Sequence, residues 1–487
     1  MRILFISSEV APFAKAGGLA DVSAALPRHL NGRGHEVRVF LPMYARVQAP
    51  GRHFTAVIPE MTFDLGPHRI RVSVHSTPLP GSNLDVYFVR CPPLYDRPSI
   101  YGEGPDEHLR FAVLSWAALK ACQYLRFAPD IAHVNDWQTA LVPLLVRSVF
   151  AWDELFARTR TVLTIHNLGH QGTFDAKVLP ETGLLPAAGL LHQDDLKAGR
   201  LGFLTTGILH ANAVTTVSPT YAREIQTPAQ GVGLDGLLRS RRNVLFGILN
   251  GIDEAEWNPG SDQYLPHHYS AADLSGKGKC KEKLLEAVRL PLRRELPVIG
   301  VVSRLVWQKG FDLCVPVLPA LLRRRAFQLV VLGTGEPRYM DFFTRLASAF
   351  PERVAFQPAF DEKRAHLIEA GADLFLMPSR YEPCGLNQMY SLRYGTPPIV
   401  HRTGGLADTV VQFEARSGAG NGFVFDHFDE AGLSWVLGRA LDIWGSGTGT
   451  DRERWVRLQH NGMRVPFGWE HRIGDYLDLY RKLAPLS

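Results

Sequence analysis

Residues 3–42 read ILFISSEVAPFAKAGGLADVSAALPRHLNGRGHEVRVFLP, and this stretch decides the class of fold. It begins with a short apolar run, Ile3 to Ser7, and ends with another, Val37 to Leu41. Between the two runs, apolar residues recur at the spacing of one helix face, at Leu19, Val22, Leu26 and Leu30. A strand, a helix and a second strand in this order form the βαβ unit of a parallel sheet.

The same alternation continues along the rest of the chain. We expect further strands at the β-branched, apolar runs Val86–Val89, Ile131–Asn135, Val162–His166, Val214–Val217, Val298–Val302, Leu329–Leu332, Val354–Phe356, Leu374–Met377 and Ile399–Val400. Segments with helix spacing lie between them. The pattern predicts an α/β protein with doubly wound parallel sheets.

The chain has 487 residues, which is too many for one compact core, because domains usually hold roughly 100 to 200 residues. A segment rich in Pro, His and Lys interrupts the alternation after Gly251. We therefore predict two Rossmann-like domains, residues 1–250 and 297–465, facing a deep cleft. Residues 251–296 are predicted to connect them, and residues 466–487 are predicted to form a C-terminal helix.

Composition excludes several classes of protein. With 46% hydrophobic and 21% charged residues, the chain is of ordinary globular type. A net charge of +5, without a block of like charges, does not support a nucleic-acid surface. No run approaches the 18 or so apolar residues of a membrane helix, and the first apolar run is too short for a signal peptide. The 5 cysteines lack C-x-x-C spacing, which argues against a disulfide framework and a zinc site. We expect a cytoplasmic protein.

A glycine pair follows the first strand, in Lys15-Ala16-Gly17-Gly18-Leu19-Ala20-Asp21. Glycine lets backbone N–H groups approach a phosphate or a sugar closely, and Lys15 adds a positive charge. The loop lacks both the G-x-G-x-x-G dinucleotide fingerprint and the Gly-Lys-Ser/Thr ending of a P-loop. It is therefore either a structural turn or part of a site for a phosphate or a sugar.

Two cations follow the first strand of the second domain, in Arg304-Leu305-Val306-Trp307-Gln308-Lys309-Gly310. Ligands of open α/β sheets bind beyond the carboxyl ends of the strands. Arg304 and Lys309 can converge there on a diphosphate, where each charge contributes on the order of 4 kcal/mol at about 4 Å, before desolvation. The alternative is that both are ordinary surface charges.

Two more strand ends are polar, in His133-Val134-Asn135-Asp136-Trp137 and in His166-Asn167-Leu168-Gly169-His170. Neither has the H-E-x-x-H or D-x-D spacing of a metal site. Each histidine, taken alone, is better explained as a hydrogen-bonded residue of the core or of a loop. A carboxylate beside an aromatic ring nevertheless suits a carbohydrate, whose hydroxyls pair with carboxylates and whose ring faces stack on Trp.

The most informative strand end is Pro378-Ser379-Arg380-Tyr381-Glu382-Pro383-Cys384-Gly385-Leu386-Asn387-Gln388, which is followed by Thr403-Gly404-Gly405-Leu406-Ala407-Asp408. Glu382 can hold sugar hydroxyls while the helix that opens after Gly385 faces a phosphate. The other interpretation is that Glu382 only caps that helix. Cys384 suggests a nucleophile, but a cysteine is more often a small buried filler.

Together these motifs resemble those of bacterial glycogen synthases and plant starch synthases, retaining glycosyltransferases with the two-domain GT-B fold. The resemblance runs from end to end and includes K-A-G-G-L-A-D, H-V-N-D-W, S-R-L-x-x-Q-K-G, P-S-R-Y-E-P-C-G-L, T-V-S-P-T-Y-A-R-E-I at 216–225 and L-N-G-I-D at 249–253. It implies transfer of glucose from ADP-glucose, or from UDP-glucose, to the non-reducing end of an α-1,4-glucan such as glycogen or a malto-oligosaccharide. It also implies retention of configuration, with the leaving phosphate taking the acceptor proton.

The resemblance implies a role for each matching residue. Glu382 binds the transferred glucose, Arg304 and Lys309 hold the diphosphate, and His166 lies beside the anomeric carbon. The donor site comprises Lys15, Gly18, Asn250, Phe360, Cys384, Gly385 and Leu386, with Phe360 in the place of an aromatic that stacks on the base. The acceptor side comprises Asp136 and Trp137. Neither a metal nor a cofactor is implied.

Two positions depart from the family pattern. Tyr381 stands where Phe is usual, and Thr205 stands where Lys is usual, so a lysine contact at Thr205 does not carry over.

Three other functions are weaker. A nicotinamide-dependent oxidoreductase rests on Gly333-Thr334-Gly335 alone, and Arg338 occupies the position of the third glycine. An inert glucan-binding scaffold does not need the cations Lys15, Arg304 and Lys309. A phosphorylase requires pyridoxal phosphate. The sequence leaves open the choice between ADP-glucose and UDP-glucose, the oligomeric state and any regulation.

Overall fold

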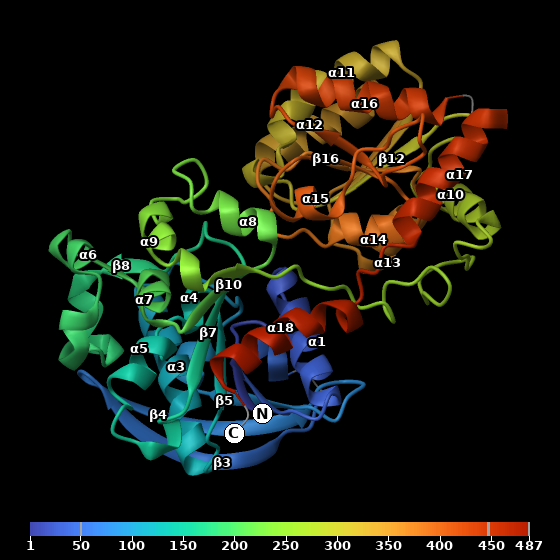
Figure 1. Ribbon diagram of the computed structural model, residues 1–487. Coiled ribbons are helices and arrows are strands. Elements are labelled where there is room, and N and C mark those ends of the chain that lie inside the picture. The colour runs from blue at the N-terminus through green and yellow to red at the C-terminus, as the bar shows by residue number, and fades with distance from the viewer. Residues whose placement is uncertain (49–50, 446–448, 486–487) are drawn as a thin grey trace. The chain divides into compact units, whose positions relative to one another are not determined.

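The computed structural model describes residues 1–48, 51–445 and 449–485 and forms two compact units. Unit 1 comprises Met1–Gly251 and Trp469–Ser487, and unit 2 comprises Ile252–Gly468. Each unit contains a mainly parallel sheet with helices packed on it (Figure 1). The predicted α/β class is therefore confirmed. Among the described residues, no helix has the length and apolar character needed to cross a membrane.

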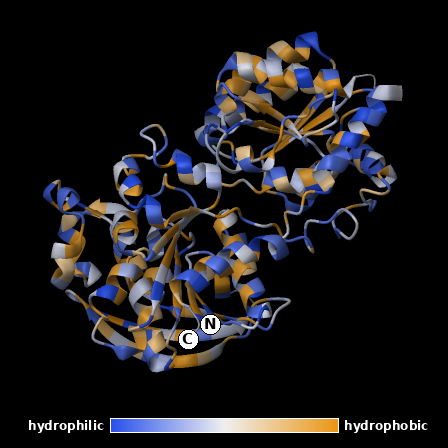
Figure 2. Ribbon diagram, viewed as in Figure 1, coloured by the Kyte–Doolittle hydropathy of each residue, from blue (hydrophilic) through white to orange (hydrophobic). Residues whose placement is uncertain are grey.

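The opening stretch folds as the βαβ unit that its pattern predicts. Strand β1 (Arg2–Ile6), helix α1 (Gly18–Gly32) and strand β2 (Glu36–Pro42) follow one another, and β1 and β2 are parallel. All four apolar positions of the predicted helix face are buried. The central parallel strands of both units stand out as hydrophobic segments in Figure 2, because a sheet covered by helices on both faces has no solvated side there.

The sheet of unit 1 has nine strands in the order β11-β10-β7-β6-β1-β2-β5-β4-β3. The remaining strands are β3 (Thr55–Leu65), β4 (His68–Pro78), β5 (Asp85–Arg90), β6 (Ile131–Asn135), β7 (Arg160–Ile165), β10 (Ala213–Thr216) and β11 (Leu245–Gly247). Seven strands are parallel, and β4 and β3 add an antiparallel edge. A separate antiparallel pair is formed by β8 (Thr173–Asp175) and β9 (Arg200–Gly202).

Short and long helices connect these strands. They are α2 (Pro92–Tyr95), α3 (Glu107–Tyr124), α4 (Asp136–Thr139), α5 (Val142–Arg147), α6 (Gln193–Lys197), α7 (Phe203–His210), α8 (Pro219–Glu224) and α9 (Asp235–Ser240). Turns of 3₁₀ helix lie at Ala45–Gln48, Glu154–Phe156, Ala176–Thr182, Leu185–Leu190 and Arg242–Val244. Helix α3 is buried along most of its length, which makes it the central helix of this core.

Unit 2 has a six-stranded, entirely parallel sheet in the order β14-β13-β12-β15-β16-β17. Its strands are β12 (Val298–Val302), β13 (Gln328–Leu332), β14 (Val354–Gln357), β15 (Leu374–Met377), β16 (Pro398–His401) and β17 (Phe423–Phe425). Its helices are α10 (Ser275–Ala287), α11 (Phe311–Arg324), α12 (Pro337–Ala349), α13 (Glu362–Gly371), α14 (Asn387–Arg393), α15 (Gly404–Thr409), α16 (Glu430–Trp444) and α17 (Gly449–Met463), with a 3₁₀ turn at Trp307–Lys309.

The segment between the two regular patterns is not merely a linker. Residues 252–296 belong to unit 2, and α10, which lies in this segment, packs on α13. The last helix, α18 (Trp469–Leu483), belongs to unit 1 and packs on α1, as Figure 1 shows for the red and dark-blue helices. The Tyr480 hydroxyl lies 2.5 Å from His133 Nδ1, inside the core. The end of the chain thus completes the core of the unit in which the chain begins.

Candidate active site

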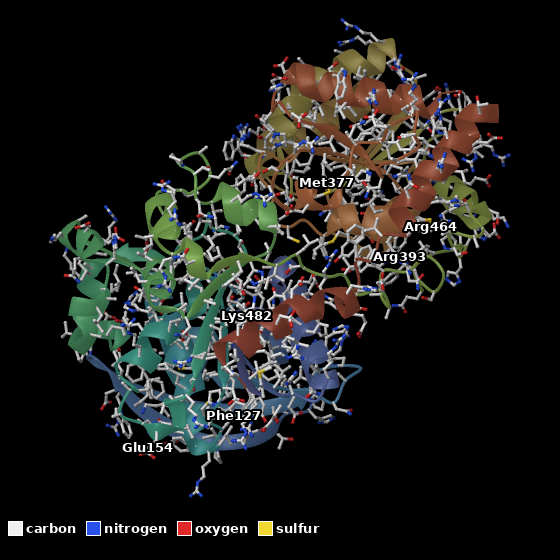
Figure 3. The ribbon with its side chains drawn as sticks, in the orientation of Figure 1. Phe127, Glu154, Met377, Arg393, Arg464 and Lys482 are labelled. Atoms are coloured by element: carbon white, nitrogen blue, oxygen red, sulfur yellow. The ribbon has the colours of Figure 1, made fainter. Side chains whose placement is uncertain are left out.

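The central strands of unit 2, β12 and β15, are adjacent in the sheet. From β12 the chain continues to β13 and β14 on one side, and from β15 it continues to β16 and β17 on the other. The connections leave in opposite directions, so this is the topological switch point at which open α/β sheets bind ligands. Met377, labelled in Figure 3, ends β15 and marks where its loop begins.

An ion pair joins the two loops at this switch point. Lys309 Nζ lies 2.6 Å from Glu382 Oε2, and the Ser379 hydroxyl donates to the same oxygen at 2.9 Å. Glu382 is only 6% exposed. Arg304, at the start of the same loop as Lys309, is exposed, and no ion pair with another described residue restrains it. The fold therefore places three of the four residues predicted to be catalytic in two neighbouring loops. Arg304 and Lys309 follow β12, and Glu382 follows β15.

Glycines allow these loops to approach each other. Gly310 has a φ of +72°, and a Cβ there would lie 1.9 Å from the Pro378 carbonyl oxygen. Gly404, with a φ of +42°, would place a Cβ 1.9 Å from the carbonyl oxygen of Glu382, and Gly405 N–H donates to that same oxygen at 3.1 Å. The glycines of the 403–408 segment thus support the Glu382 loop, because no larger residue fits there.

The residues after Glu382 form a tight turn into α14. Cys384 is 5% exposed, which fits a packing role. Gly385 has a φ of +73°, and a Cβ there would lie 2.4 Å from Gln388 Oε1. Leu386 occupies the N-cap position of α14, where no side chain caps the helix. The structure therefore does not support the alternative that Glu382 is a helix cap.

Two other loops of the same sheet contain Phe360 and the segment Gly333-Thr334-Gly335. Phe360 follows the edge strand β14 and is 84% exposed, which is unusual for a large apolar side chain. Gly333 would place a Cβ 1.9 Å from the Ser303 carbonyl oxygen, and Gly335 would place one 2.2 Å from that of Leu305. The Gly-Thr-Gly segment is therefore explained by close packing against the β12 loop.

Unit 1 has its own switch point, between the adjacent strands β1 and β6. In the loop after β1, Lys15 Nζ lies 2.8 Å from Asp21 Oδ1, and Gly18 is the first residue of α1. Glu9, which was not among the predicted residues, accepts the N–H groups of Ala16 and Gly17 through its Oε2 at 2.6 and 2.9 Å. Burial raises the pKa of Glu9. Its position in the polar Ser-Ser-Glu end of the first strand was the available signal.

The ends of β6 and β7 meet in a second polar cluster. Asp136 has a φ of +53°, in the left-handed region, and its Oδ1 accepts the backbone N–H of His166 at 2.7 Å. His166 Nε2 donates to Asn135 Oδ1 at 2.9 Å. Burial raises the pKa of Asp136 to about 7 and lowers the pKa of His166 to about 3. His166 is therefore a neutral imidazole at physiological pH, with one N–H committed to Asn135.

The aromatic and histidine residues next to this cluster are packed in the core. Trp137 is 8% exposed, and its ring contacts Phe111, Phe174 and Phe203 at centroid distances of 5.0, 5.6 and 6.2 Å. His133 is fully buried and bonded to Thr164 and Tyr480. Trp137 thus positions the strand end, and a direct contact of its ring with a sugar stays a prediction.

The last of the predicted residues, Asn250, follows β11 in unit 1. It is 4% exposed, and its Oδ1 accepts no hydrogen bond within the described part of the chain. A buried carbonyl oxygen without a donor is rare in folded proteins. Thr205 in α7 is 3% exposed, so the position at which the family pattern has Lys is occupied here by a small buried residue.

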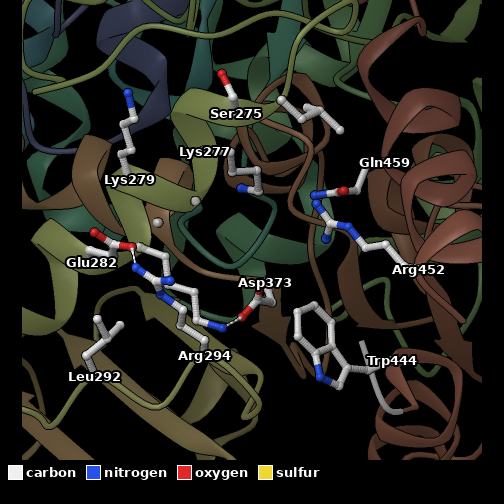
Figure 4. Close-up of a pocket in the computed structure, with 14 residues that line it drawn as sticks. Ser275, Lys277, Lys279, Glu282, Leu292, Arg294, Asp373, Trp444, Arg452 and Gln459 are labelled. Atoms are coloured by element: carbon white, nitrogen blue, oxygen red, sulfur yellow. Dashed lines mark hydrogen bonds and ion pairs between the residues drawn. The ribbon is translucent and has the colours of Figure 1, made fainter. Parts of the chain in front are cut away.

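A pocket of about 410 Å³ lies elsewhere in unit 2 and is drawn in Figure 4. Its lining includes Lys277, Lys281, Asp373, Trp444 and Arg452, and none of the predicted site residues. Lys281 Nζ is paired with Asp373 at 2.7 Å. The switch points, and not this pocket, hold the candidate active-site residues.

Comparison with known proteins gives the family. A family model described as the starch synthase catalytic domain matches residues 2–240, and one described as glycosyl transferases group 1 matches residues 285–456. A glycogen synthase from Anaeromyxobacter dehalogenans is 47% identical over 490 residues, covering all of both chains. The chain belongs to the glycogen and starch synthase family. A glycogen synthase from Thermotoga maritima is 42% identical and covers 99% of each chain. The resemblance drawn from the motifs is confirmed, and the chain is a glycosyltransferase of this family.

Solved structures agree with this assignment. The catalytic domain of starch synthase IV from Arabidopsis thaliana, bound to ADP and acarbose, has a TM-score of 0.91 at 34% identity and covers 99% of each chain. A sucrose-phosphate synthase from Thermosynechococcus elongatus, at 18% identity and a TM-score of 0.61, shares the fold. The prediction of a GT-B fold with two parallel α/β domains is confirmed.

Proposed function

We propose that this glycosyltransferase moves glucose from ADP-glucose to the non-reducing end of an α-1,4-glucan, with retention of configuration. The observation that carries the proposal is the contact between Lys309 and Glu382 at the switch point of unit 2, with Arg304 in the same loop. A cation and a carboxylate held together there match a ligand with a diphosphate on one side and a sugar on the other. The related starch synthase structure, which contains ADP and acarbose, supports both partners.

Arg304 and Lys309 act on the leaving group in this proposal. Breaking the bond between the sugar and the diphosphate develops positive charge on the anomeric carbon and negative charge on the phosphate oxygen. Preorganised cations that stabilise the departing charge lower the barrier more than they strengthen ground-state binding. Arg304 has the conformational freedom to close on the phosphate, because no ion pair to another described residue holds it.

Glu382 binds the hydroxyls of the transferred glucose in this proposal. Its Oε2 already accepts from Lys309 and Ser379, so the carboxylate is fixed in position before the donor arrives. A carboxylate restrained in this way offers its other oxygen to sugar hydroxyls at little further cost in conformational entropy. Lys309 thus contacts the residue that holds the sugar and, together with Arg304, holds the diphosphate.

The acceptor hydroxyl attacks the face of the sugar from which the diphosphate leaves, and the departing phosphate oxygen takes the hydroxyl proton. This route needs no side chain as general base, which suits a His166 whose pKa burial lowers to about 3. His166 is proposed to lie beside the anomeric carbon as a neutral hydrogen-bonding group. Asp136 is proposed to bind the glucan, with Trp137 supporting it from behind.

The remaining donor contacts are part of the same proposal. Phe360 stacks on the base, since an 84% exposed ring has a face available for it. Lys15 and Gly18 contact the donor through the loop that Glu9 shapes. Asn250, Gly385 and Leu386 contribute polar or backbone groups, and Cys384 packs beneath them.

A transfer assay tests the proposal. Purified protein is incubated with glycogen and radiolabelled ADP-glucose or UDP-glucose in parallel, and label in the polysaccharide is measured before and after digestion with an α-1,4-specific amylase. We expect faster incorporation from ADP-glucose and release of the label by the amylase. Incorporation from neither donor contradicts the proposed function, whereas faster incorporation from UDP-glucose corrects the donor alone.

The proposal includes catalysis without a metal or a cofactor, because the cations of the β12 loop take the place of a divalent ion. We expect the rate to stay within about twofold in excess chelator. A loss of activity that magnesium or manganese restores contradicts this part. We also propose that the reaction takes place in the cytoplasm, which fits the burial of all 5 cysteines as thiols.

A further inference from the structure

A group of three potential metal ligands lies in unit 2, apart from the residues assigned to glucose transfer. Glu256, Glu362 and His366 each offer one ligand atom, and these atoms lie within 4.8 Å of one another. Glu362 and His366 are four residues apart on α13, so their side chains project from the same face of the helix. Glu256 comes from the first turn of unit 2. Two segments far apart in sequence therefore meet at this group.

His366 is held in the orientation of a metal ligand. Its Nδ1 donates to Asp262 Oδ2 at 2.7 Å, and both side chains are almost completely buried. The ring stacks on Trp257 at a centroid distance of 3.8 Å. Asp262 is fixed in turn by the Tyr394 hydroxyl at 2.6 Å. A carboxylate bonded to one ring nitrogen sets the tautomer, so that the other nitrogen presents its lone pair.

The other nitrogen of His366 has no partner inside the described protein. Nε2 is buried, and no hydrogen bond reaches it. A buried ring nitrogen with a directed lone pair and no donor requires an explanation, because such groups are normally satisfied. Neither glutamate carboxylate makes a hydrogen bond to Nε2, and one carboxylate oxygen of each glutamate lies within 4.8 Å of a ring nitrogen of His366. Nε2 is therefore the ring nitrogen left for an ion, because Nδ1 is bonded to Asp262.

We propose that His366 Nε2 and one carboxylate oxygen each of Glu256 and Glu362 bind a Zn²⁺ ion. Bonds of about 2.0–2.2 Å place tetrahedral ligand atoms roughly 3.4 Å apart, so a small movement of the glutamates closes the site. One imidazole with two carboxylates is a ligand set for zinc, whereas calcium and magnesium prefer oxygen alone. Three protein ligands leave a fourth position for water.

The ion ties the first turn of unit 2 to α13 and does not take part in glucose transfer. None of its three ligands belongs to the β12 or β15 loops. Zinc is thus expected to change the stability of unit 2, whereas the rate of transfer by the metal-free protein is set by other residues. This separates the zinc proposal from the proposed function, because either one can fail while the other holds.

Zinc titration of the full-length protein, stripped of metal with a chelator and then desalted, tests the site. Isothermal calorimetry is expected to give one site, and Zn²⁺ is expected to raise the melting temperature. Co²⁺ in its place is expected to give the visible absorption of a four- or five-coordinate ion. Mg²⁺ and Ca²⁺ are expected to give neither signal. If no binding is detected with Zn²⁺ at up to about 100 µM, any Kd is weaker than this value, and the proposal is overturned.

Glutamine variants assign the site without disturbing the buried histidine. Glu256→Gln and Glu362→Gln are each expected to weaken zinc binding about 10-fold or more, while circular dichroism and glucose transfer stay unchanged. The matched control is Glu430→Gln, since Glu430 also opens a helix directly after an aspartate that caps it. Unchanged zinc affinity in the Glu256→Gln, Glu362→Gln double variant overturns the proposal and places any bound zinc elsewhere.

Discussion

The switch points of the two units use charge in opposite ways. In unit 2, Lys309 and Glu382 form a direct ion pair at 2.6 Å, and Arg304 in the same loop is exposed. In unit 1, burial raises the pKa of Asp136 to about 7 and lowers that of His166 to about 3. The unit 2 site keeps its charges, whereas at the ends of β6 and β7 in unit 1 the charged forms of Asp136 and His166 are both disfavoured.

This difference follows from the partners that each strand end provides. In the unit 2 loops, a carboxylate and an ammonium stabilise each other's charge, so the site remains suited to an anionic ligand such as a diphosphate. In unit 1, Asp136 and His166 receive neutral hydrogen-bonding partners, a backbone N–H and an amide oxygen. A site of this kind suits the neutral hydroxyls of a glucan. One switch point is thus expected to govern the donor and the other the acceptor.

Replacing Arg304 should produce the largest effect. Arg304→Ala is expected to lower kcat about 10²-fold or more, because the loss of one charged partner of a developing anion costs roughly 3 kcal/mol. The measurement is kcat with saturating donor and glycogen. Arg345→Ala removes another exposed arginine of unit 2, on α12, and serves as the control. Equal rates for the two variants would contradict the proposal that Arg304 in the β12 loop stabilises the charge of the leaving group.

Neutralising Glu382 should have the next largest effect and separates the sugar from the nucleotide. Glu382→Gln keeps the shape but loses charge-assisted hydrogen bonds of about 2 kcal/mol, so kcat should fall roughly 30-fold. Binding of ADP, measured by calorimetry, should be nearly unchanged, since the affected bonds form only with the sugar. Glu414→Gln, which removes the carboxylate of an exposed ion pair with Arg439, is the control. A lower melting temperature with normal turnover would remove Glu382 from the active site.

At the other switch point, Asp136→Asn should act on the acceptor. We expect KM for glycogen to rise about 10-fold, because the loss of one good hydrogen bond costs about 1.4 kcal/mol. KM for the donor should be unchanged. Steady-state kinetics with one substrate varied at a time gives both constants, and Asp194→Asn, in the exposed part of α6, is the control. A change in donor KM alone would reverse the roles given to the two switch points.

The same variant should show a smaller, pH-dependent effect on stability. The pKa of Asp136 is about 7 in the folded protein against 3.8 for an ordinary aspartate, so the folded state binds the proton more tightly. The resulting stabilisation is present at low pH and is lost as the pH rises through about 7. Relative to the wild type, Asp136→Asn should therefore gain stability between pH 6.5 and 8, by on the order of 1 kcal/mol.

Melting temperatures of both proteins at these two pH values provide the measurement. A difference between variant and wild type that is the same at both pH values would show that Asp136 is charged in the folded state throughout this range. The contrast between a charged and an uncharged switch point would then fail, although the assignment of the acceptor side would still rest on the kinetics.

Local patterns were sufficient for most of the parallel strands, although the three-residue edge strands β11 and β17 were not predicted. Strands β6, β12 and β15 begin and end at the predicted residues, because buried parallel strands are short apolar runs with polar residues at both ends. The antiparallel strands β3 and β4 were missed. Their residues alternate between buried and exposed and carry several charges, so they lack the continuous apolar run by which the others were found.

The site residues were proposed from the same kind of local pattern, and their roles stay predictions. A cation or a carboxylate at a strand end is visible in the sequence, which is how Arg304, Lys309 and Glu382 were found. Trp137 was interpreted as a surface for a sugar, yet it is packed among phenylalanines from three other segments. Glu9 was passed over, although it shapes the Lys15 loop through two backbone N–H groups. Packing and backbone partners depend on distant segments, so a local pattern does not contain them.

The sequence by itself determined the class of fold, the family and the residue types at each strand end, because these depend on apolar periodicity and on motifs within a few residues. Only the tertiary structure decided which strand ends meet. Lys309 and Glu382 are 73 residues apart, and they touch because β12 and β15 are neighbours in the sheet and because Gly310 lets the two loops approach. The order of strands reflects how all the helices and strands of a unit pack into one core, and no short stretch of sequence specifies that order.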